Sequence, residues 1–142
     1  MKKTTDLLII DDEEAILIML NRYISRMDNI NIHKAQSFEE GKTLLVEKRP
    51  KIIITDVELP DGNGLEIVKL AKKLSHAKQV IVMTGGSNIE RLLEALACGA
   101  TDFLEKPLDM DLLKNVISES IERFERWEKL FKKELSKCRK KR

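Results

Sequence analysis

The sequence contains few cysteine, proline, glycine or aromatic residues, and each shortage excludes a class of protein. Its 142 residues include two cysteines, three prolines and six glycines, and 4% of them are aromatic. Two cysteines are too few for a disulfide-stabilised secreted scaffold, so we expect a reducing, cytoplasmic location. The low glycine and proline content excludes collagen-like and low-complexity chains. The apolar runs fall far short of the ~20 residues of a membrane helix, so we expect no membrane association.

The remaining composition indicates one globular domain with an uneven distribution of charge. Hydrophobic residues make up 42% of the chain and charged residues 35%, and the net charge is +2. Residues 119–142 contain ten Lys or Arg and five Asp or Glu, so the basic charge lies in the C-terminal tail. A basic tail can bind nucleic acid or an acidic partner, but it is more often the solvated face of a helix. The tail has no recognition motif, so we do not expect direct nucleic-acid binding.

The hydrophobic pattern predicts strands that alternate with helices. Short, unbroken apolar runs are typical of strands buried on both faces, as in a parallel sheet covered by helices. Strands are predicted at 7–10, 30–35, 52–54, 80–83 and 101–105. Between them, apolar residues recur every three or four positions, as in helices. Five strands alternating with five helices predict an α/β fold, with a doubly wound parallel sheet and helices on both faces.

Charged and hydroxyl side chains follow the predicted strands. Asp11 and Asp12 come directly after the first apolar run, Asp56 ends the third, Thr84 ends the fourth and Lys106 ends the fifth. Ligands of such sheets bind beyond the carboxyl ends of the strands, where these side chains should meet. Three clustered carboxylates repel one another unless a cation is present, and oxygen ligands suit Mg²⁺. Each residue alone has an ordinary structural role, but the combination indicates a site.

These positions and their neighbours resemble the receiver domain of response regulators in two-component signalling. The similarity spans about residues 5–120 and implies a flavodoxin-like, five-stranded sheet in the order 2-1-3-4-5. We therefore expect a receiver domain at 1–120 and a C-terminal helical extension at 121–142. The matching features are Asp11-Asp12; Asp56 with Leu59-Pro60 and Gly64; Thr84-Gly85; Gly99-Ala100 before Asp102-Phe103; and Lys106-Pro107.

The resemblance implies that Asp56 is the phosphoacceptor. Its carboxylate would take a phosphoryl group from a histidine kinase or a phosphotransfer protein and form an acyl phosphate. Asp11, Asp12, Asp56 and the backbone carbonyl of Glu58 would hold Mg²⁺ or Mn²⁺, which neutralises charge during the transfer. Such a domain assists its own phosphorylation and dephosphorylation but is not a classical enzyme.

The resemblance also implies roles for residues around the phosphoacceptor. Lys106, aimed inward by a cis peptide bond to Pro107, would pair with a phosphoryl oxygen. Thr84 would donate a hydrogen bond to another oxygen, and Phe103 would move into the space that Thr84 leaves. This switch would then control a partner or an output domain, neither of which the sequence identifies.

Two other functions compete with a regulator that controls an output. A stand-alone phosphorelay carrier would have the same site without an output domain. An aspartate-nucleophile phosphatase would need a second Asp two residues after the nucleophile, where this chain has Glu58. Nucleotide-binding enzymes need a phosphate-binding loop that the sequence lacks.

The tail has a partial heptad pattern beyond the receiver core. Ile117, Phe124, Phe131 and Cys138 recur every seven residues, and Trp127 follows Phe124 by three. An isolated helix gains little stability from propensity alone, so these apolar residues should be buried. A homodimer through a coiled coil, a linker helix to an output domain, and packing of the tail onto its own domain all remain open.

Overall fold

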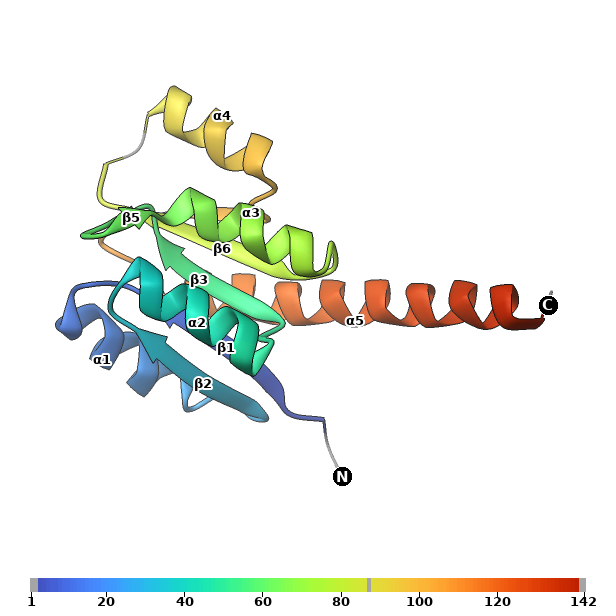
Figure 1. The fold of residues 1–142 in the computed structure, drawn as a ribbon. Helices are drawn as coiled ribbons and strands as arrows, with labels where there is room; N and C mark the ends of the chain where they lie inside the picture. The colour runs from blue at the N-terminus through green and yellow to red at the C-terminus, as the bar shows by residue number, and fades with distance from the viewer. Residues whose placement is uncertain (1–2, 87, 141–142) are drawn as a thin grey trace.

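Five parallel strands form the main sheet in the computed structural model, which describes residues 3–86 and 88–140. The order across the sheet is β2, β1, β3, β6 and β7 (Figure 1), which is 2-1-3-4-5 when only these strands are counted. The predicted fold class is therefore confirmed. The main strands are β1 (Thr5–Ile10), β2 (Ile30–Ala35), β3 (Ile52–Asp56), β6 (Gln79–Thr84) and β7 (Asp102–Glu105); β4 (Glu58–Leu59) and β5 (Gly62–Asn63) form a separate antiparallel pair.

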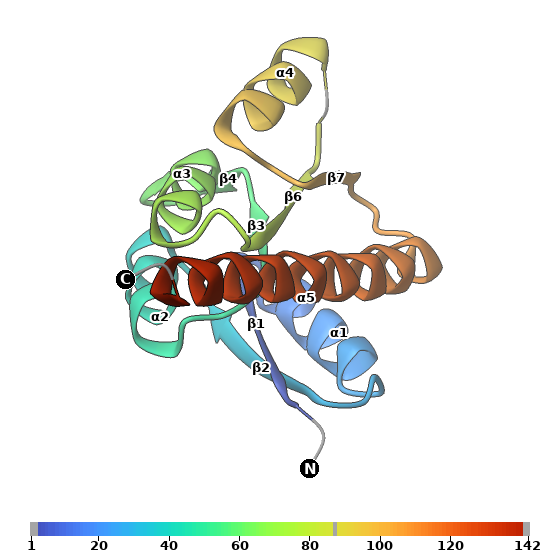
Figure 2. The same ribbon diagram turned by 90° about the vertical axis from the view of Figure 1, so that its right-hand side faces the viewer.

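Helices cover both faces of the sheet, as the alternating pattern predicted. One face packs against α1 (Glu14–Ile24) and α5 (Met110–Lys140). The other packs against α2 (Phe38–Lys48) and α3 (Gly64–Leu74), and α4 (Ile89–Cys98) lies beside α3 (Figures 1 and 2). Each strand therefore contributes to two separate hydrophobic cores.

The strand residues show why the apolar runs are unbroken. Successive side chains of a strand point to opposite faces of the sheet. Leu8 and Ile10 of β1 lie in the core under α2 and α3, whereas Leu7 and Ile9 lie in the core under α1 and α5. All four are fully buried. Burial on both faces removes the polar alternation that a half-exposed strand would show.

Side-chain caps fix where the helices begin. Ser37 Oγ accepts a hydrogen bond from the Glu40 backbone N–H at 3.1 Å, and Asn63 Oδ1 accepts one from that of Leu65 at 2.9 Å. Asp109 caps α5 in the same way. Each cap satisfies a backbone donor that the first helical turn leaves free. The helices that follow the strands therefore start at the carboxyl edge of the sheet.

The last helix continues well beyond the sheet. α5 has 31 residues, which corresponds to a length of about 46 Å, and its second half projects from the body (Figure 1). Phe124 is still buried and lies under the Lys51 ammonium, 5.1 Å from the ring centroid. Residues 129–139 are exposed, so this part of α5 does not pack onto the body.

Among the described residues, no helix is both long enough and apolar enough to cross a membrane. The cytoplasmic location stays a prediction.

Candidate functional site

Three carboxylates meet at the carboxyl ends of β1 and β3. One oxygen from each of Asp11, Asp12 and Asp56 lies within 4.8 Å of the other two. Asp11 is fully buried and Asp56 is nearly so, whereas Asp12 is exposed. The Glu13 backbone N–H donates to Asp11 Oδ1 at 2.9 Å, and that of Glu58 donates to Asp56 Oδ1 at 3.2 Å. The second oxygen of each buried carboxylate remains available to other groups.

Lys106 at the end of β7 joins the two buried carboxylates. Its ammonium lies 2.8 Å from Asp11 Oδ2 and 2.9 Å from Asp56 Oδ2. The peptide bond between Lys106 and Pro107 is cis. The Lys106 backbone N–H donates to the Thr84 carbonyl at 2.8 Å, which fixes the end of β7 against β6. Asp11 and Asp56, which lie 95 and 50 positions from Lys106 in the sequence, therefore share its ammonium group.

Burial and charge act in opposite directions on the ionisation of this cluster. Burial lowers the pKa of Lys106, but hydrogen bonds to Asp11 and Asp56 and their charges outweigh it and hold the pKa above its ordinary value. Burial raises the pKa of Asp56, which the Lys106 ammonium and the Glu58 backbone N–H only partly oppose. The buried carboxylate is thus held in an environment that favours additional positive charge.

The donor set fits a hard divalent cation. One ammonium faces three carboxylates, which leaves an excess of negative charge at the edge of the sheet. In this group the candidate ligand atoms are carboxylate oxygens, and Mg²⁺ takes a few such oxygens together with water. The observed cluster therefore suits Mg²⁺. Coordination of the ion by the Glu58 backbone carbonyl stays a prediction.

The start of α3 approaches the phosphoacceptor candidate closely. The Gly64 backbone N–H donates to the Val57 carbonyl at 2.7 Å, and Thr55 Oγ1 donates to the Asp56 carbonyl at 3.0 Å. A Cβ atom at Gly64 would overlap the Asp56 carbonyl oxygen, so a side chain cannot be accommodated without displacement. Glycine at this position allows α3 to fix the backbone that carries the Asp56 carboxylate.

Thr84 lies at the same edge, but its hydroxyl is turned to its own loop. The side chain is buried at the end of β6, and Oγ1 donates to the Gly86 carbonyl at 3.0 Å. The same oxygen accepts from the Gly86 backbone N–H at 3.3 Å and from Arg91 Nη1 at 3.3 Å. Arg91, an arginine that no sequence motif distinguishes, also pairs with the Glu58 carboxylate.

Phe103 occupies the space between β7 and α4. It pairs in register with Val82 of β6, and its ring is partly buried. Together with Leu92 and Leu96 of α4, it lines a hollow of about 290 Å³. The structure thus places the ring on β7, which β6 separates from β3, and next to the helix that follows Thr84. Its part in a switch stays a prediction.

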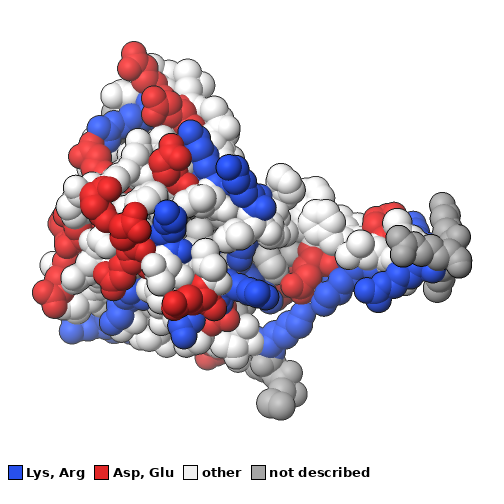
Figure 3. All heavy atoms as spheres, viewed as in Figure 1, with Lys and Arg blue, Asp and Glu red and all other residues white. Residues whose placement is uncertain are grey.

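Surface charge separates the two ends of the molecule. In Figure 3, acidic side chains gather at the end where the strands terminate, whereas Lys and Arg follow the projecting part of α5.

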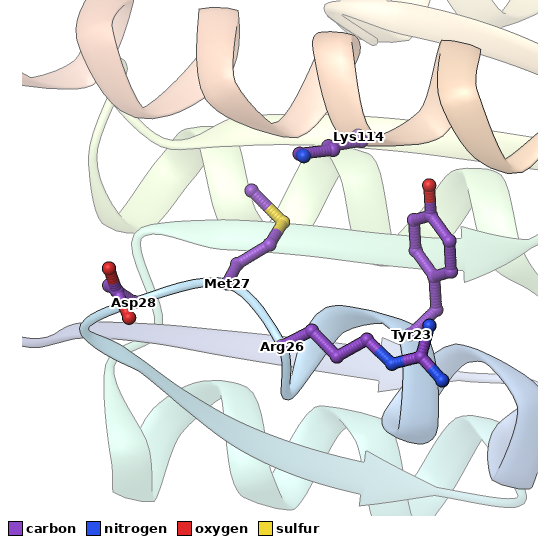
Figure 4. A pocket seen from close by; sticks show the side chains of 5 residues that line it. All are labelled: Tyr23, Arg26, Met27, Asp28 and Lys114. Carbon is purple, nitrogen blue, oxygen red and sulfur yellow. The ribbon is translucent and has the colours of Figure 1, made fainter.

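A hollow of about 410 Å³ elsewhere is lined by Tyr23, Arg26, Met27, Asp28 and Lys114 (Figure 4). None of these residues belongs to the acidic cluster, so the hollow is separate from the site around Asp56.

Comparison with known proteins identifies the class to which this fold and site belong. Residues 7–118 match the family described as the response regulator receiver domain, so the chain belongs to that family. Receiver domains act in two-component signalling, where histidine kinases phosphorylate them, and they bind Mg²⁺ at an acidic pocket. The predicted family is therefore confirmed.

Individual relatives are regulators that are longer than this chain. RegA of Rhodobacter capsulatus, a photosynthetic apparatus regulatory protein, is 32% identical over 78% of the chain and 60% of its own length. ActR of Rhizobium meliloti, an acid tolerance regulatory protein, is 34% identical over 84% of the chain and 61% of its own length. The chain thus spans less than two thirds of each of these relatives.

Solved receiver structures share the fold. A CheY-like receiver domain protein from Methanospirillum hungatei has a TM-score of 0.79 at 26% identity, covering 87% of this chain and 99% of that protein. The beryllofluoride-activated NtrC4 receiver domain dimer has a TM-score of 0.77 at 28% identity, covering 84% and 98%. The shared region is the receiver core.

Proposed function

We propose that Asp56 accepts a phosphoryl group from a phosphohistidine of a histidine kinase or phosphotransfer protein, in a Mg²⁺-dependent reaction. The observation that carries this proposal is the position of the Asp56 carboxylate. It lies 2.9 Å from the Lys106 ammonium and beside the carboxylates of Asp11 and Asp12, at the open edge of the sheet. The site thus combines a nucleophile with groups that attract a cation and neutralise negative charge.

The transfer needs little covalent chemistry from the protein. An Asp56 carboxylate oxygen attacks the phosphorus, the bond from phosphorus to the imidazole nitrogen breaks, and an acyl phosphate forms. The leaving nitrogen keeps the bonding electron pair. Lys106 holds the carboxylate in position and then pairs with a phosphoryl oxygen. Mg²⁺, held by Asp11, Asp12 and Asp56, supplies neutralisation of the negative oxygens when bound.

The acyl phosphate then changes the partners of Thr84. Its hydroxyl leaves the Gly86 carbonyl and donates to a phosphoryl oxygen, and Phe103 moves into the space that Thr84 leaves. The two arrangements differ by the few contacts that Thr84 exchanges, so the coupling is on the order of 1–3 kcal/mol. A partner or an output domain responds because it binds one of the two arrangements more tightly than the other.

Mass spectrometry tests the phosphoacceptor. The chain is incubated with acetyl phosphate and Mg²⁺, and we expect one added phosphoryl group that Asp56→Asn and removal of Mg²⁺ both abolish. Asp28→Asn, which changes an exposed aspartate outside the cluster, should leave the modification intact. Modification of Asp56→Asn to the wild-type extent contradicts the assignment of the site, and no modification of the wild type contradicts the function.

We also propose that a second copy of this chain covers the projecting part of α5. The exposed side chains of Trp127, Phe131 and Leu135 continue the face of α5 that Ile117 and Phe124 bury against the body. The Trp127 and Phe131 rings stack with centroids 6.0 Å apart. Seven-residue recurrence on one face is typical of a helix that pairs with another helix, and two parallel tails would bury both faces.

Light scattering measures this association with and without beryllofluoride and Mg²⁺. We expect a dimer that Phe131→Gln weakens, because it removes the apolar side chain at the centre of the exposed face. Lys129→Gln, two positions earlier on the solvent side of the helix, should leave the dimer intact. Because the tail is basic, added salt should screen repulsion and strengthen the dimer. A monomer under all these conditions contradicts the proposal.

A further inference from the structure

One arginine links the two segments that flank Asp56. Arg91 lies in the first turn of α4, and its side chain is about one third exposed. Arg91 Nη1 donates to Thr84 Oγ1 at 3.3 Å, and Nη2 pairs with the Glu58 carboxylate. The Glu58 backbone N–H in turn donates to Asp56 Oδ1 at 3.2 Å. A single guanidinium therefore bridges β4 and the end of β6 beside the phosphoacceptor.

The backbone of Arg91 is itself fixed. Asn88, the N-cap of α4, accepts a hydrogen bond from the Arg91 backbone N–H at 2.8 Å. Within α4 the buried residue is Ala95, so the packing of this helix on the body is sparse. The contacts of Arg91 with Thr84 and Glu58 are thus a main connection between the start of α4 and the edge of the sheet.

The Thr84 hydroxyl has a single proton, which it gives to the Gly86 carbonyl. Its oxygen accepts from the Gly86 backbone N–H and from Arg91. To donate to a phosphoryl group on Asp56, the hydroxyl must give up the bond to Gly86. The proposed switch also moves Oγ1 toward that group, away from the position in which Arg91 Nη1 donates to it at 3.3 Å. The guanidinium therefore interacts with one of the two positions of Thr84 and favours it.

We propose that Arg91 is a positioning residue that holds Thr84 in the position it takes before phosphorylation, and so opposes the switch. The inference rests on the proposed function, because it concerns the same phosphoryl site. Glu58 supports the arrangement by holding the other side of the guanidinium, whose planar fork serves two acceptors at once. Removal of Arg91 frees Thr84 and makes the phosphorylated conformation easier to reach.

Beryllofluoride, a mimic of the phosphoryl group, provides the test when its affinity is measured by calorimetry with Mg²⁺. Arg91→Ala should bind the mimic about 3- to 10-fold more tightly than the wild type, the effect of one ordinary hydrogen bond, because solvent weakens the charged donor of this partly exposed side chain. Arg91→Lys keeps a cation but lacks the fork, so it should fall between the two. A residue that only supported the fold would not increase the affinity when removed.

Thr84→Val identifies the route of the effect, because valine keeps the shape of threonine and lacks the hydroxyl. In the Thr84→Val background, Arg91→Ala should no longer change the affinity. If the full effect persists there, Arg91 acts through the charge of Glu58, and the inference is wrong. Unchanged or weaker binding by Arg91→Ala in the otherwise wild-type chain also overturns it.

Two controls separate this inference from the proposed function. Arg22→Ala removes an exposed arginine of α1 and should leave the affinity unchanged. Asp56→Asn should abolish binding of the mimic. If the wild type itself does not bind beryllofluoride, the proposed function fails; if it binds through Asp56 and Arg91→Ala is no tighter, only the inference on Arg91 fails. Urea unfolding confirms that each variant is folded.

Discussion

Replacement of Lys106 by methionine tests the electrostatic basis of the site. The variant keeps an unbranched chain of similar length but removes the ammonium that lies 2.8 Å from Asp11 and 2.9 Å from Asp56. The Asp11 side chain is fully buried and that of Asp56 is 10% exposed, so water replaces the lost partner poorly. Without a divalent cation, the variant must hold two buried carboxylates without their shared counterion.

The magnitude follows from these distances. At an effective dielectric constant of about 20, unit charges 2.8 Å apart attract by roughly 6 kcal/mol, which desolvation offsets in large part. Removal of one partner of a buried pair costs about 3–5 kcal/mol. Lys106 is 13% exposed, so we expect the lower end, about 3 kcal/mol. A typical domain stability of about 5–15 kcal/mol leaves the variant folded.

The pH dependence has a defined sign. Because the pKa of Lys106 is raised, its contribution is complete below the ordinary lysine pKa of about 10.4 and is lost as pH rises through the raised value. On the acid side, protonation of Asp56, whose pKa is also raised, removes the partner. The difference between wild type and variant should therefore be largest near neutral pH and should shrink in acid.

Urea unfolding in a chelator, at neutral and acid pH, measures the difference. Lys69→Met is the matched control, because Lys69 forms an exposed ion pair with Glu66 that contributes little to stability. An unchanged midpoint for Lys106→Met at neutral pH, or a loss of equal size in acid, would refute the argument from the buried carboxylates.

Three further predictions concern the surroundings of the site. Gly64→Ala should lose about 1–3 kcal/mol in urea unfolding, because its Cβ would meet the Asp56 carbonyl, whereas Gly85→Ala has open space and should change stability by less than about 0.5 kcal/mol. Mg²⁺ at a hundredfold excess over Kd should raise the free energy of unfolding of the wild type by about 2.7 kcal/mol, and Asp12→Asn should remove most of this gain; an equal gain in the variant contradicts the ligand assignment. Backbone N–H groups at the start of α2 donate to Asp61 and lower its pKa, so the stability it contributes is present above about pH 3.9 and is lost as pH falls through the lowered value. The urea midpoints of wild type and Asp61→Asn should therefore differ at neutral pH and converge in strong acid.

The sequence was sufficient to predict the sheet and the meeting of its carboxyl ends. Apolar runs are unbroken where strands are buried on both faces, so the positions of Asp11, Asp56 and Lys106 after those runs already indicated one edge. The structure brings these three side chains into direct contact. Strand order came from the family resemblance, because hydrophobic periodicity does not specify which strands are neighbours.

The cross-links around that edge could not be predicted. Arg91 reaches Glu58 across 33 positions in the sequence, and Asp61 reaches the backbone of Phe38 across 23. Such contacts follow no period, and an arginine in a helix ordinarily indicates a solvated face. The direction of the Thr84 hydroxyl could not be predicted either, because the sequence pattern of a threonine at the end of a strand does not depend on its rotamer.

The geometry of α5 gives this receiver a lever arm. The helix begins next to the Lys106–Pro107 bond at the acidic edge, crosses the body, and continues for sixteen residues past Phe124. Sixteen helical residues span about 24 Å, so a tilt of roughly 10° where α5 leaves the sheet would displace its far end by about 4 Å. A small rearrangement beside Asp56 would thus displace the far end of α5 by about 4 Å and change how it packs against another helix.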